Sequence, residues 1–350
     1  MITGLELEKT ANLNTGLGQF CLNLTDNILK LAPQDMQFQA YLPAGQTGLF
    51  GSRLQVLPQK SWHRWKFPQK IRPDVWHCMH QDSVYHPEGK IPVLLTIHDL
   101  NFMQKYSGFR RELRKKKLGR MLEKSSALVC ISRATGQHLE EVFGLSAADY
   151  QVIYNGNALK HFAPGRPASI GEGVPFLLNL GVLSPRKNAH VLCGMLAHLP
   201  GMHLVIAGPV HRDYHLRILA EARRYGVSGR IVLAGEVSEE EKFQLLSHTK
   251  GLVFPSLAEG FGLPVTEAMS LGKPVFLSRF GSLPEIGGDA AFYWENFDPE
   301  SMAALVSEGL GKSSSDSFRD GLTRRAALFS WEQAASEYLD IYRRLAKISV

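Results

Sequence analysis

A short apolar run that leads through a glycine-rich turn into a helix start constrains this chain most. Residues 251–254 (GLVF) predict a buried strand. Gly260 and Gly262 let the backbone turn tightly and approach a ligand. Pro264 suits the first turn of a helix, where its missing N–H would have no partner. Because a helix start offers free N–H groups and partial positive charge, the segment predicts a strand–loop–helix unit with an anion site.

Two carboxylates flank this turn. Glu259 precedes the glycines, and Glu267 lies inside the predicted helix. A carboxylate recognises a phosphate poorly, but it accepts hydrogen bonds from sugar hydroxyls. The local chemistry therefore predicts a pocket for a ligand that carries both phosphate and polyol groups.

The string EGFGLPxxEA at residues 259–268 resembles the E-x7-E signature of the retaining family-four glycosyltransferases, which have the GT-B fold. The resemblance implies that Glu259 contacts the donor sugar and Glu267 the ribose hydroxyls of the nucleotide. It also implies that backbone amides around Phe261, Gly262 and Leu263 meet the sugar and the diphosphate.

The length and composition suit a two-domain α/β protein. The chain has 350 residues of ordinary composition, enough for two domains with buried cores. Short strands are predicted at 4–7, 36–42, 54–57, 74–79, 92–97, 127–132, 150–157, 176–180, 202–207, 231–237, 251–254 and 274–278. Near-continuous apolar strands such as 92–97 are typical of parallel sheets.

The resemblance makes the expected architecture specific. It implies two facing, doubly wound, Rossmann-like domains with an inter-domain cleft. A Pro- and Gly-containing linker predicts the boundary, so we expect an acceptor-side domain at 1–163 and a nucleotide-sugar domain at 164–332. The last helix, at about 333–350, is expected to pack back on the first domain.

Compartment and cofactors follow from what the sequence lacks. No apolar run reaches the roughly 18 residues of a membrane span, and the first residues do not resemble a secretory signal. The four cysteines have no zinc spacing and predict buried, reduced thiols of a cytoplasmic protein. No Asp-x-Asp-like pair predicts a metal site, so we expect neither a metal nor a cofactor.

Two loops are predicted to serve the donor phosphates. Gly16 and Gly18 predict a loop that feeds a helix from Gln19 onward, and the resemblance places this loop beside the phosphates and the acceptor. In GVLSPRKN, residues 181–188, Arg186 can bind two phosphate oxygens and Lys187 acts as a point charge. That string resembles the diphosphate clamp of the family.

Further residues follow from the same resemblance. The string TIHDL, residues 96–100, puts a polar pair after a predicted central strand, where α/β proteins bind ligands. It resembles the mannosyltransferase-like branch, in which His98 would lie at the junction of donor sugar and acceptor and act catalytically. Asp99 would orient this loop or His98. Backbone contacts around Glu236 and Val237 would seat the nucleotide base.

Positive charge gathers in the first half of the chain. The net charge is +6, and residues 109–124 predict a basic amphipathic helix with an apolar stripe of Leu113, Leu118, Met121 and Leu122. Its basic residues include Arg110, Arg111, Arg114, Lys115, Lys116, Lys117 and Arg120. With Trp62 and Trp65, they favour an anionic membrane surface, although a solvated helix face stays open. No motif indicates nucleic acid.

The residues and the resemblance together predict a metal-independent enzyme that transfers a sugar, with retention of configuration, from a nucleotide sugar to a glycan or lipid-linked acceptor. GDP-mannose is the first choice of donor and a UDP-sugar the second. The expected setting is bacterial surface polysaccharide or lipopolysaccharide synthesis at the inner face of the membrane. A non-catalytic sugar-nucleotide-binding protein, an epimerase and a phosphorylase remain alternatives.

Overall fold

The computed structural model describes residues 1–68, 72–87, 89–209 and 211–348. The chain forms two compact units, one of Met1–Gly156 with Ser330–Val350 and one of Asn157–Phe329. All recorded strand pairs in both sheets are parallel. This confirms the predicted class of two Rossmann-like α/β domains. The expected roles of the two domains, acceptor side and nucleotide-sugar side, stay predictions.

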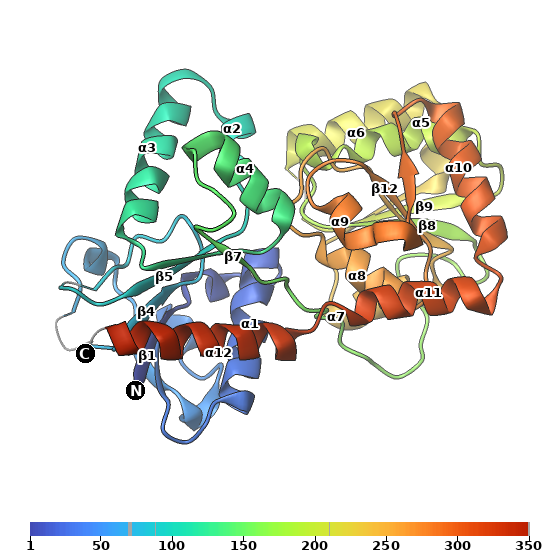
Figure 1. The fold of residues 1–350 in the computed structure, drawn as a ribbon. Coiled ribbons are helices and arrows are strands. Elements are labelled where there is room, and N and C mark those ends of the chain that lie inside the picture. The colour runs from blue at the N-terminus through green and yellow to red at the C-terminus, as the bar shows by residue number, and fades with distance from the viewer. Residues whose placement is uncertain (69–71, 88, 210, 349–350) are drawn as a thin grey trace. The chain divides into compact units, whose positions relative to one another are not determined.

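The first unit holds a seven-stranded sheet with the order β3-β2-β1-β4-β5-β6-β7 among the described residues (Figure 1). The strands are β1 (Ile2–Glu6), β2 (Gln37–Leu42), β3 (Gln55–Pro58), β4 (Val75–Cys78), β5 (Val93–Ile97), β6 (Ala127–Cys130) and β7 (Gln151–Val152). The helices are α1 (Gly16–Leu31), α2 (Phe102–Lys105), α3 (Gly108–Lys124), α4 (Arg133–Phe143) and α12 (Trp331–Ile348).

The second unit holds a six-stranded sheet, again counted over the described residues, with the order β10-β9-β8-β11-β12-β13. The strands are β8 (Phe176–Leu180), β9 (His203–Ala207), β10 (Ile231–Gly235), β11 (Gly251–Phe254), β12 (Val275–Ser278) and β13 (Phe292–Trp294). The helices are α5 (Leu192–Ala197), α6 (Arg212–Arg224), α7 (Glu239–His248), α8 (Leu263–Ser270), α9 (Leu283–Gly287), α10 (Pro299–Lys312) and α11 (Asp316–Ala327).

Most strands lie where the sequence placed them, and two differ. The predicted strand 150–157 is wrong in length, because only Gln151 and Val152 pair with β6. Beyond this strand, Gly156 packs closely against Trp331. A Cβ added to Gly156 would lie 2.1 Å from the backbone nitrogen of Trp331. The three-residue strand β13 was not predicted.

The strand order reverses once in each sheet. β1 pairs with both β2 and β4, and β8 pairs with both β9 and β11. In open α/β sheets, ligands bind beyond the carboxyl ends of the strands at such a switch point. The two places to search for a site are therefore the ends of β1 and β4 and the ends of β8 and β11.

Buried polar contacts fix α12 to the sheet of the first unit, where this helix runs beside α1 (Figure 1). His77 of β4 contacts Tyr342 through Nδ1 at 2.7 Å and Thr96 through Nε2 at 2.8 Å. The hydroxyl of Tyr338 lies 3.0 Å from that of Thr96. Because all four side chains are buried, these hydrogen bonds specify how the last helix packs.

We expect the stability of this unit to fall as the pH falls below about 6.5. Burial lowers the pKa of His77 and of His98 to about 3, whereas an unfolded chain binds a proton at each near 6.5. The unfolded state therefore holds more protons between these values, and each histidine contributes a slope of about 1.4 kcal/mol per pH unit. Urea unfolding between pH 4 and 6 measures this slope.

His77→Gln should remove the contribution of His77 to that slope, about 1.4 kcal/mol per pH unit, whatever its effect on absolute stability. The exposed His198 provides a matched control, because His198→Gln removes a histidine that is open to solvent. A slope that His77→Gln leaves unchanged would contradict the buried neutral state of His77.

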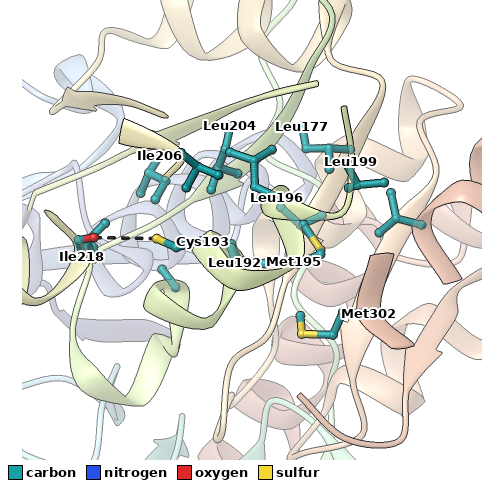
Figure 2. Packing of buried hydrophobic residues seen from close by; sticks show 14 of the residues in the cluster. Leu177, Leu192, Cys193, Met195, Leu196, Leu199, Leu204, Ile206, Ile218 and Met302 are labelled. Atoms are coloured by element: carbon teal, nitrogen blue, oxygen red, sulfur yellow. Dashed lines mark hydrogen bonds between the residues drawn. The ribbon is translucent and has the colours of Figure 1, made fainter. Parts of the chain in front are cut away.

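The core of the second unit contains one of the four cysteines (Figure 2). Cys193 packs among Leu192, Leu196 and Ile218, and its Sγ lies 3.7 Å from the Ile218 carbonyl oxygen. Burial raises the pKa of this thiol to about 12. All four cysteines are free and buried, as the sequence predicted.

Candidate functional site

The switch point of the second sheet brings two predicted loops together. β8 ends at Leu180 and its neighbour β11 ends at Phe254, so the segments that follow leave the same edge of the sheet side by side. Lys187 from the first segment places Nζ 2.6 Å from Oε1 of Glu259 in the second. Residues 72 positions apart in the sequence thus form one site.

Backbone geometry shapes the segment that carries Lys187. Pro185–Lys187 forms a single 3-10 turn, and the buried Asn188 then adopts a left-handed conformation with φ 56°. Asparagine tolerates this region better than most residues. Gly208, at φ 134°, passes so close that its Cβ would lie 2.0 Å from the Gly181 carbonyl oxygen. The turn after β8 therefore requires glycine at position 208.

Glu259 is ionised and neutralised by two cations. Its side chain is 8% exposed, and Nη1 of Arg186 lies 3.7 Å from Oε2. Burial raises the pKa of Glu259, but Lys187 and Arg186 lower it by more, so it lies below its usual value. Arg186 also donates a hydrogen bond to the Ala258 carbonyl. The three charged groups carry one net positive charge, which can meet an anionic ligand.

A third loop, after β12, supports the backbone of Glu259. Ser282 donates its N–H to the Glu259 carbonyl at 3.1 Å and its Oγ hydrogen to the Phe261 carbonyl at 2.8 Å. Gly281 has φ 60°, and a Cβ there would lie 2.5 Å from the Glu259 carbonyl oxygen. The sequence analysis gave these two residues no role.

Helix α8 starts at the expected glycine turn. It begins at Leu263, one residue before Pro264, and Gly262 precedes it at φ 100°. Gly262 and Phe261 are buried. The Phe261 ring packs edge-on against the Phe329 ring, with 5.5 Å between the ring centroids. The predicted sugar and diphosphate contacts of residues 261–263 thus fall at the start of a helix, and they stay predictions.

Glu267 pairs with a lysine that the sequence analysis missed. Nζ of Lys242, in α7, lies 3.0 Å from Glu267 and 3.0 Å from Glu239. Burial raises the pKa of Glu267, and Lys242 opposes this effect. No sequence pattern predicts the contact, because α7 and α8 meet only in the folded unit. Glu236 and Val237, predicted to seat the base, lie between the end of β10 at Gly235 and α7.

His98 of the first unit directly follows β5 and is 5% exposed. Its Nε2 lies 2.7 Å from the Met79 carbonyl, and because a carbonyl oxygen only accepts, we assign the ring hydrogen to Nε2 and a lone pair to Nδ1. Burial lowers the pKa of His98 to about 3. Its imidazole is therefore neutral. Asp99 accepts a hydrogen bond from the Asn101 N–H at 2.9 Å, so its carboxylate orients this loop.

The first glycine loop is a helix start. α1 begins at Gly16, so the prediction of a loop up to Gln19 was wrong. Thr15 caps the helix, and its hydroxyl accepts the N–H of Gly18 at 3.1 Å. A Cβ on Gly18 would lie 2.1 Å from the Asn12 carbonyl oxygen, whereas Gly16 is exposed with open space around it. The phosphate roles of both glycines stay predictions.

The basic helix is present, but its apolar stripe is shorter than predicted. Leu118, Met121 and Leu122 of α3 are buried, whereas Leu113 is 58% exposed. Phe109, in the first turn of α3, is 81% exposed. The seven predicted basic residues, Arg110, Arg111, Arg114, Lys115, Lys116, Lys117 and Arg120, are exposed or half-buried. The two predicted surface tryptophans, Trp62 and Trp65, are 48% and 75% exposed.

Two protein-family descriptions match consecutive parts of the chain. "Glycosyltransferase Family 4" matches residues 32–159, and "Glycosyl transferases group 1" matches residues 166–319. The match therefore extends over both units of the structure. It includes His98 in the first and the Lys187–Glu259 pair in the second.

Individual proteins agree with the family match. The chain is 28% identical over 296 residues to O-antigen chain mannosyltransferase B of Escherichia coli. The matched region covers 76% of this chain and 75% of that protein. Sucrose-phosphate synthase of Thermosynechococcus elongatus shares the fold with a TM-score of 0.76 and 18% identity over 99% of each chain. HepE of Anabaena, solved with UDP and glucose, has a TM-score of 0.76 and 18% identity over 97% of this chain and 100% of its own. The chain belongs to the family-four glycosyltransferases, and its fold is GT-B.

Proposed function

We propose that this glycosyltransferase moves a sugar from a nucleotide diphosphate donor to a glycan or lipid-linked acceptor, with retention of configuration. One observation carries the proposal: Lys187, Arg186 and Glu259 converge at the switch point of the second sheet. The cations suit a diphosphate, and the ionised carboxylate suits sugar hydroxyls. The setting we propose is bacterial surface polysaccharide or lipopolysaccharide synthesis, which the E. coli relative supports.

The same residues explain how transfer would proceed. As the bond between the sugar and the diphosphate breaks, negative charge grows on the leaving phosphate. Lys187, Arg186 and the N–H groups that start α8 are already in place there, so they stabilise this state more than the ground state. The diphosphate thus needs no metal ion. The acceptor oxygen attacks the same face of the sugar and passes its proton to the departing phosphate oxygen.

Glu259 serves in this account as an orienting group for the donor sugar. Its carboxylate is held by two cations that lower its basicity, so it is a poor nucleophile and a covalent intermediate is disfavoured. Glu267, held by Lys242 at 3.0 Å, would accept the ribose hydroxyls. Backbone groups near Glu236 and Val237 would contact the base.

The donor is proposed as GDP-mannose first and a UDP-sugar second. The name of the E. coli relative supports mannose, and the UDP and glucose held by HepE support the second choice. Thermal unfolding with GDP, GDP-mannose, UDP and UDP-glucose discriminates between them, because a ligand at 100 times its Kd stabilises by about 2.7 kcal/mol. GDP-mannose should raise the Tm most, and Lys187→Met should abolish the shift. If no nucleotide raises the Tm of the unaltered protein, the proposed function is wrong.

We propose that His98 acts as a neutral hydrogen-bonding group toward the sugar. His98→Ala should lower kcat/KM by about tenfold or more, the value of one or more hydrogen bonds. Because the pKa of His98 is about 3, the enzyme and the variant should have pH–rate profiles of the same shape between pH 5 and 8. An acidic limb near pH 6.5 that only the variant loses would show instead that His98 titrates during the reaction.

A membrane role is proposed for the start of α3. None of the helices in the described part of the chain is long and apolar enough to cross a bilayer. The α3 patch, defined as Phe109, Arg110, Leu113, Arg114 and Lys116, instead combines exposed apolar and basic side chains. Such a surface suits peripheral binding to anionic lipids at the inner face of the membrane.

Neutralising three charges tests this membrane role. Each basic residue near an anionic surface contributes about 1 kcal/mol, so Arg110→Gln, Arg114→Gln and Lys116→Gln together should weaken binding to phosphatidylglycerol vesicles by about 100-fold. The control makes the same change at the exposed Arg212, Arg223 and Arg224 of α6. If both variants lose vesicle binding equally, the α3 patch has no specific role in membrane binding.

A further inference from the structure

Lys242 connects two helices of the second unit through a nearly buried ion pair. It lies in α7, and Glu267 lies in α8, 25 positions further along the chain. Nζ of Lys242 lies 3.0 Å from Oε1 of Glu267 and 3.0 Å from Oε2 of Glu239. The side chains of Lys242 and Glu267 are 16% and 5% exposed, whereas that of Glu239 is 30% exposed. A single ammonium group therefore holds one nearly buried carboxylate and one that is open to solvent.

Helix α7 is itself fixed by the linker segment that precedes β8. The carboxylate of Glu241 accepts the N–H groups of Ala168 and Ser169, both at 2.9 Å. The side-chain oxygen of Gln244 accepts the N–H of Gly165 at 3.1 Å. The ammonium group thus comes from a helix whose position several hydrogen bonds specify, and it can hold a partner carboxylate in a defined place.

The segment before α7 connects this ion pair to the proposed donor site. Glu236 and Val237, proposed to contact the base, directly precede Ser238, which caps the first turn of α7. Lys242 lies about one helical turn beyond this cap. The ion pair with Glu267 thus joins the helix that follows the proposed base contacts to the helix that starts at the proposed diphosphate contacts. In a nucleotide diphosphate, the ribose links the base to the phosphates, so its hydroxyls would lie at this junction.

The charge state of Glu267 depends on Lys242. Burial raises the pKa of Glu267 above its usual value, Lys242 opposes this effect, and Glu239 adds to it. Lys242 and Glu239 are the charged groups beside Glu267 in the part of the chain that the structure describes. Burial lowers the pKa of Lys242, but the two carboxylates raise it by more, so the lysine stays charged. Without this cation, a carboxyl group as buried as Glu267 would take up a proton at a higher pH.

The charge on Glu267 matters for a ligand with hydroxyl groups. An ionised carboxylate only accepts hydrogen bonds, and a bond to a charged acceptor is about twice as strong as one between neutral groups. We propose that Lys242 is the positioning residue of the ribose subsite: its ammonium group holds the Glu267 carboxylate in place and in the charged form that accepts the ribose hydroxyls. This inference rests on the proposed function and adds what sets the affinity of that site for the ribose.

Dideoxy-GDP, which lacks both ribose hydroxyls, isolates this contribution. The ratio of its Kd to that of GDP measures what the hydroxyls add, and titration of the phosphates cancels because both ligands carry them. Isothermal titration calorimetry between pH 5 and 9 should give a ratio of about tenfold or more near pH 8. The ratio should fall toward one as the pH falls and Glu267 takes up a proton. If UDP is the nucleotide that raises the Tm most, the corresponding uridine pair takes their place.

Two substitutions should move this pH dependence in opposite directions. Lys242→Met keeps most of the apolar stem but removes the charge that favours the ionised Glu267, so the ratio should fall at a higher pH than in the unaltered protein. Glu239→Gln removes a charge that disfavours it, so the ratio should fall at a lower pH. Lys242→Arg keeps a cation and should resemble the unaltered protein more than Lys242→Met does. Lys312→Met, which breaks an exposed pair with Glu308, is the control and should leave the ratio unchanged.

A purely structural role of Lys242 would weaken the binding of both ligands alike. Equal losses for GDP and dideoxy-GDP in Lys242→Met, with an unshifted pH dependence, would therefore overturn the inference. If Lys242→Met does not fold, the partly exposed Glu239→Gln decides, and an unshifted ratio there would overturn it as well. An unaltered protein that binds both ligands equally would also overturn the inference, while the diphosphate site at Lys187 would stand. If no nucleotide binds, the proposed function and this inference are both wrong.

Discussion

Replacing Lys187 with methionine is expected to lower kcat by about 10²–10³-fold, the loss measured when one preorganised donor to a developing anion is removed. The side chain of Lys187 is 13% exposed. Its Nζ lies 2.6 Å from Oε1 of Glu259, at the proposed diphosphate site. Methionine keeps most of the apolar stem but removes the charge. Steady-state transfer from the donor that gives the largest Tm shift measures the effect.

Stability should fall as well, for a separate reason. Without Lys187, the carboxylate of Glu259 stays buried, and Arg186 at 3.7 Å is the cation that remains beside it among the described residues. Breaking a buried ion pair costs about 3–5 kcal/mol. The double variant Lys187→Met, Glu259→Gln removes the unpaired charge, so it should regain most of the stability but none of the rate. Lys312→Met breaks the exposed pair with Glu308 and should cost less than about 1 kcal/mol. Near-normal turnover in Lys187→Met would refute the diphosphate role.

The second large effect is expected from Gly281→Ala. Gly281 has φ 60°, where a side chain is strained by about 1–2 kcal/mol. The new Cβ would lie 2.5 Å from the carbonyl oxygen and 2.8 Å from the nitrogen of Glu259. Neither backbone atom can move aside as the end of a side chain can, so the turn that carries Glu259 must shift. A displacement of about 1 Å costs about 100-fold in rate, which is the expected loss in kcat/KM.

Gly321→Ala provides the control for this change. Gly321 lies within α11, and no atom of the described residues outside its own helix turn comes within 4 Å of an added Cβ. There alanine should raise the free energy of unfolding by about 0.5–1 kcal/mol, because glycine is a poor helix former. If Gly281→Ala is as active as Gly321→Ala, the packing of the 281–282 loop does not position Glu259.

Local sequence predicted those parts of the fold that depend on local chemistry. The strands 176–180 and 251–254 were predicted with the bounds that the structure gives, because both are short runs, apolar except for Asn179, with clear ends. β13 was missed because three residues hold too little pattern. The start of α1 was predicted too late because Gly16 and Gly18 favour a loop, whereas the Thr15 cap permits a helix.

In the candidate site, the sequence predicted individual residues but not the contacts between them. The sequence indicated Lys187 and Glu259 separately, but their contact follows from the adjacency of β8 and β11, which no short-range pattern contains. Lys242 was missed for the same reason, since its partner lies on another element. Leu113 was placed in the apolar stripe because periodicity alone does not tell which turns of α3 are covered, and only the turns that hold Leu118, Met121 and Leu122 are buried.

The most direct test of the central claim is a crystal structure of the protein with GDP bound, repeated with UDP. The account predicts that a phosphate oxygen lies within about 3.2 Å of Nζ of Lys187 or the guanidinium of Arg186, and that ribose hydroxyls donate to Glu267. The account would be contradicted by a nucleotide that binds elsewhere while the 2.6 Å contact between Lys187 and Glu259 stays intact and neither side chain touches the nucleotide.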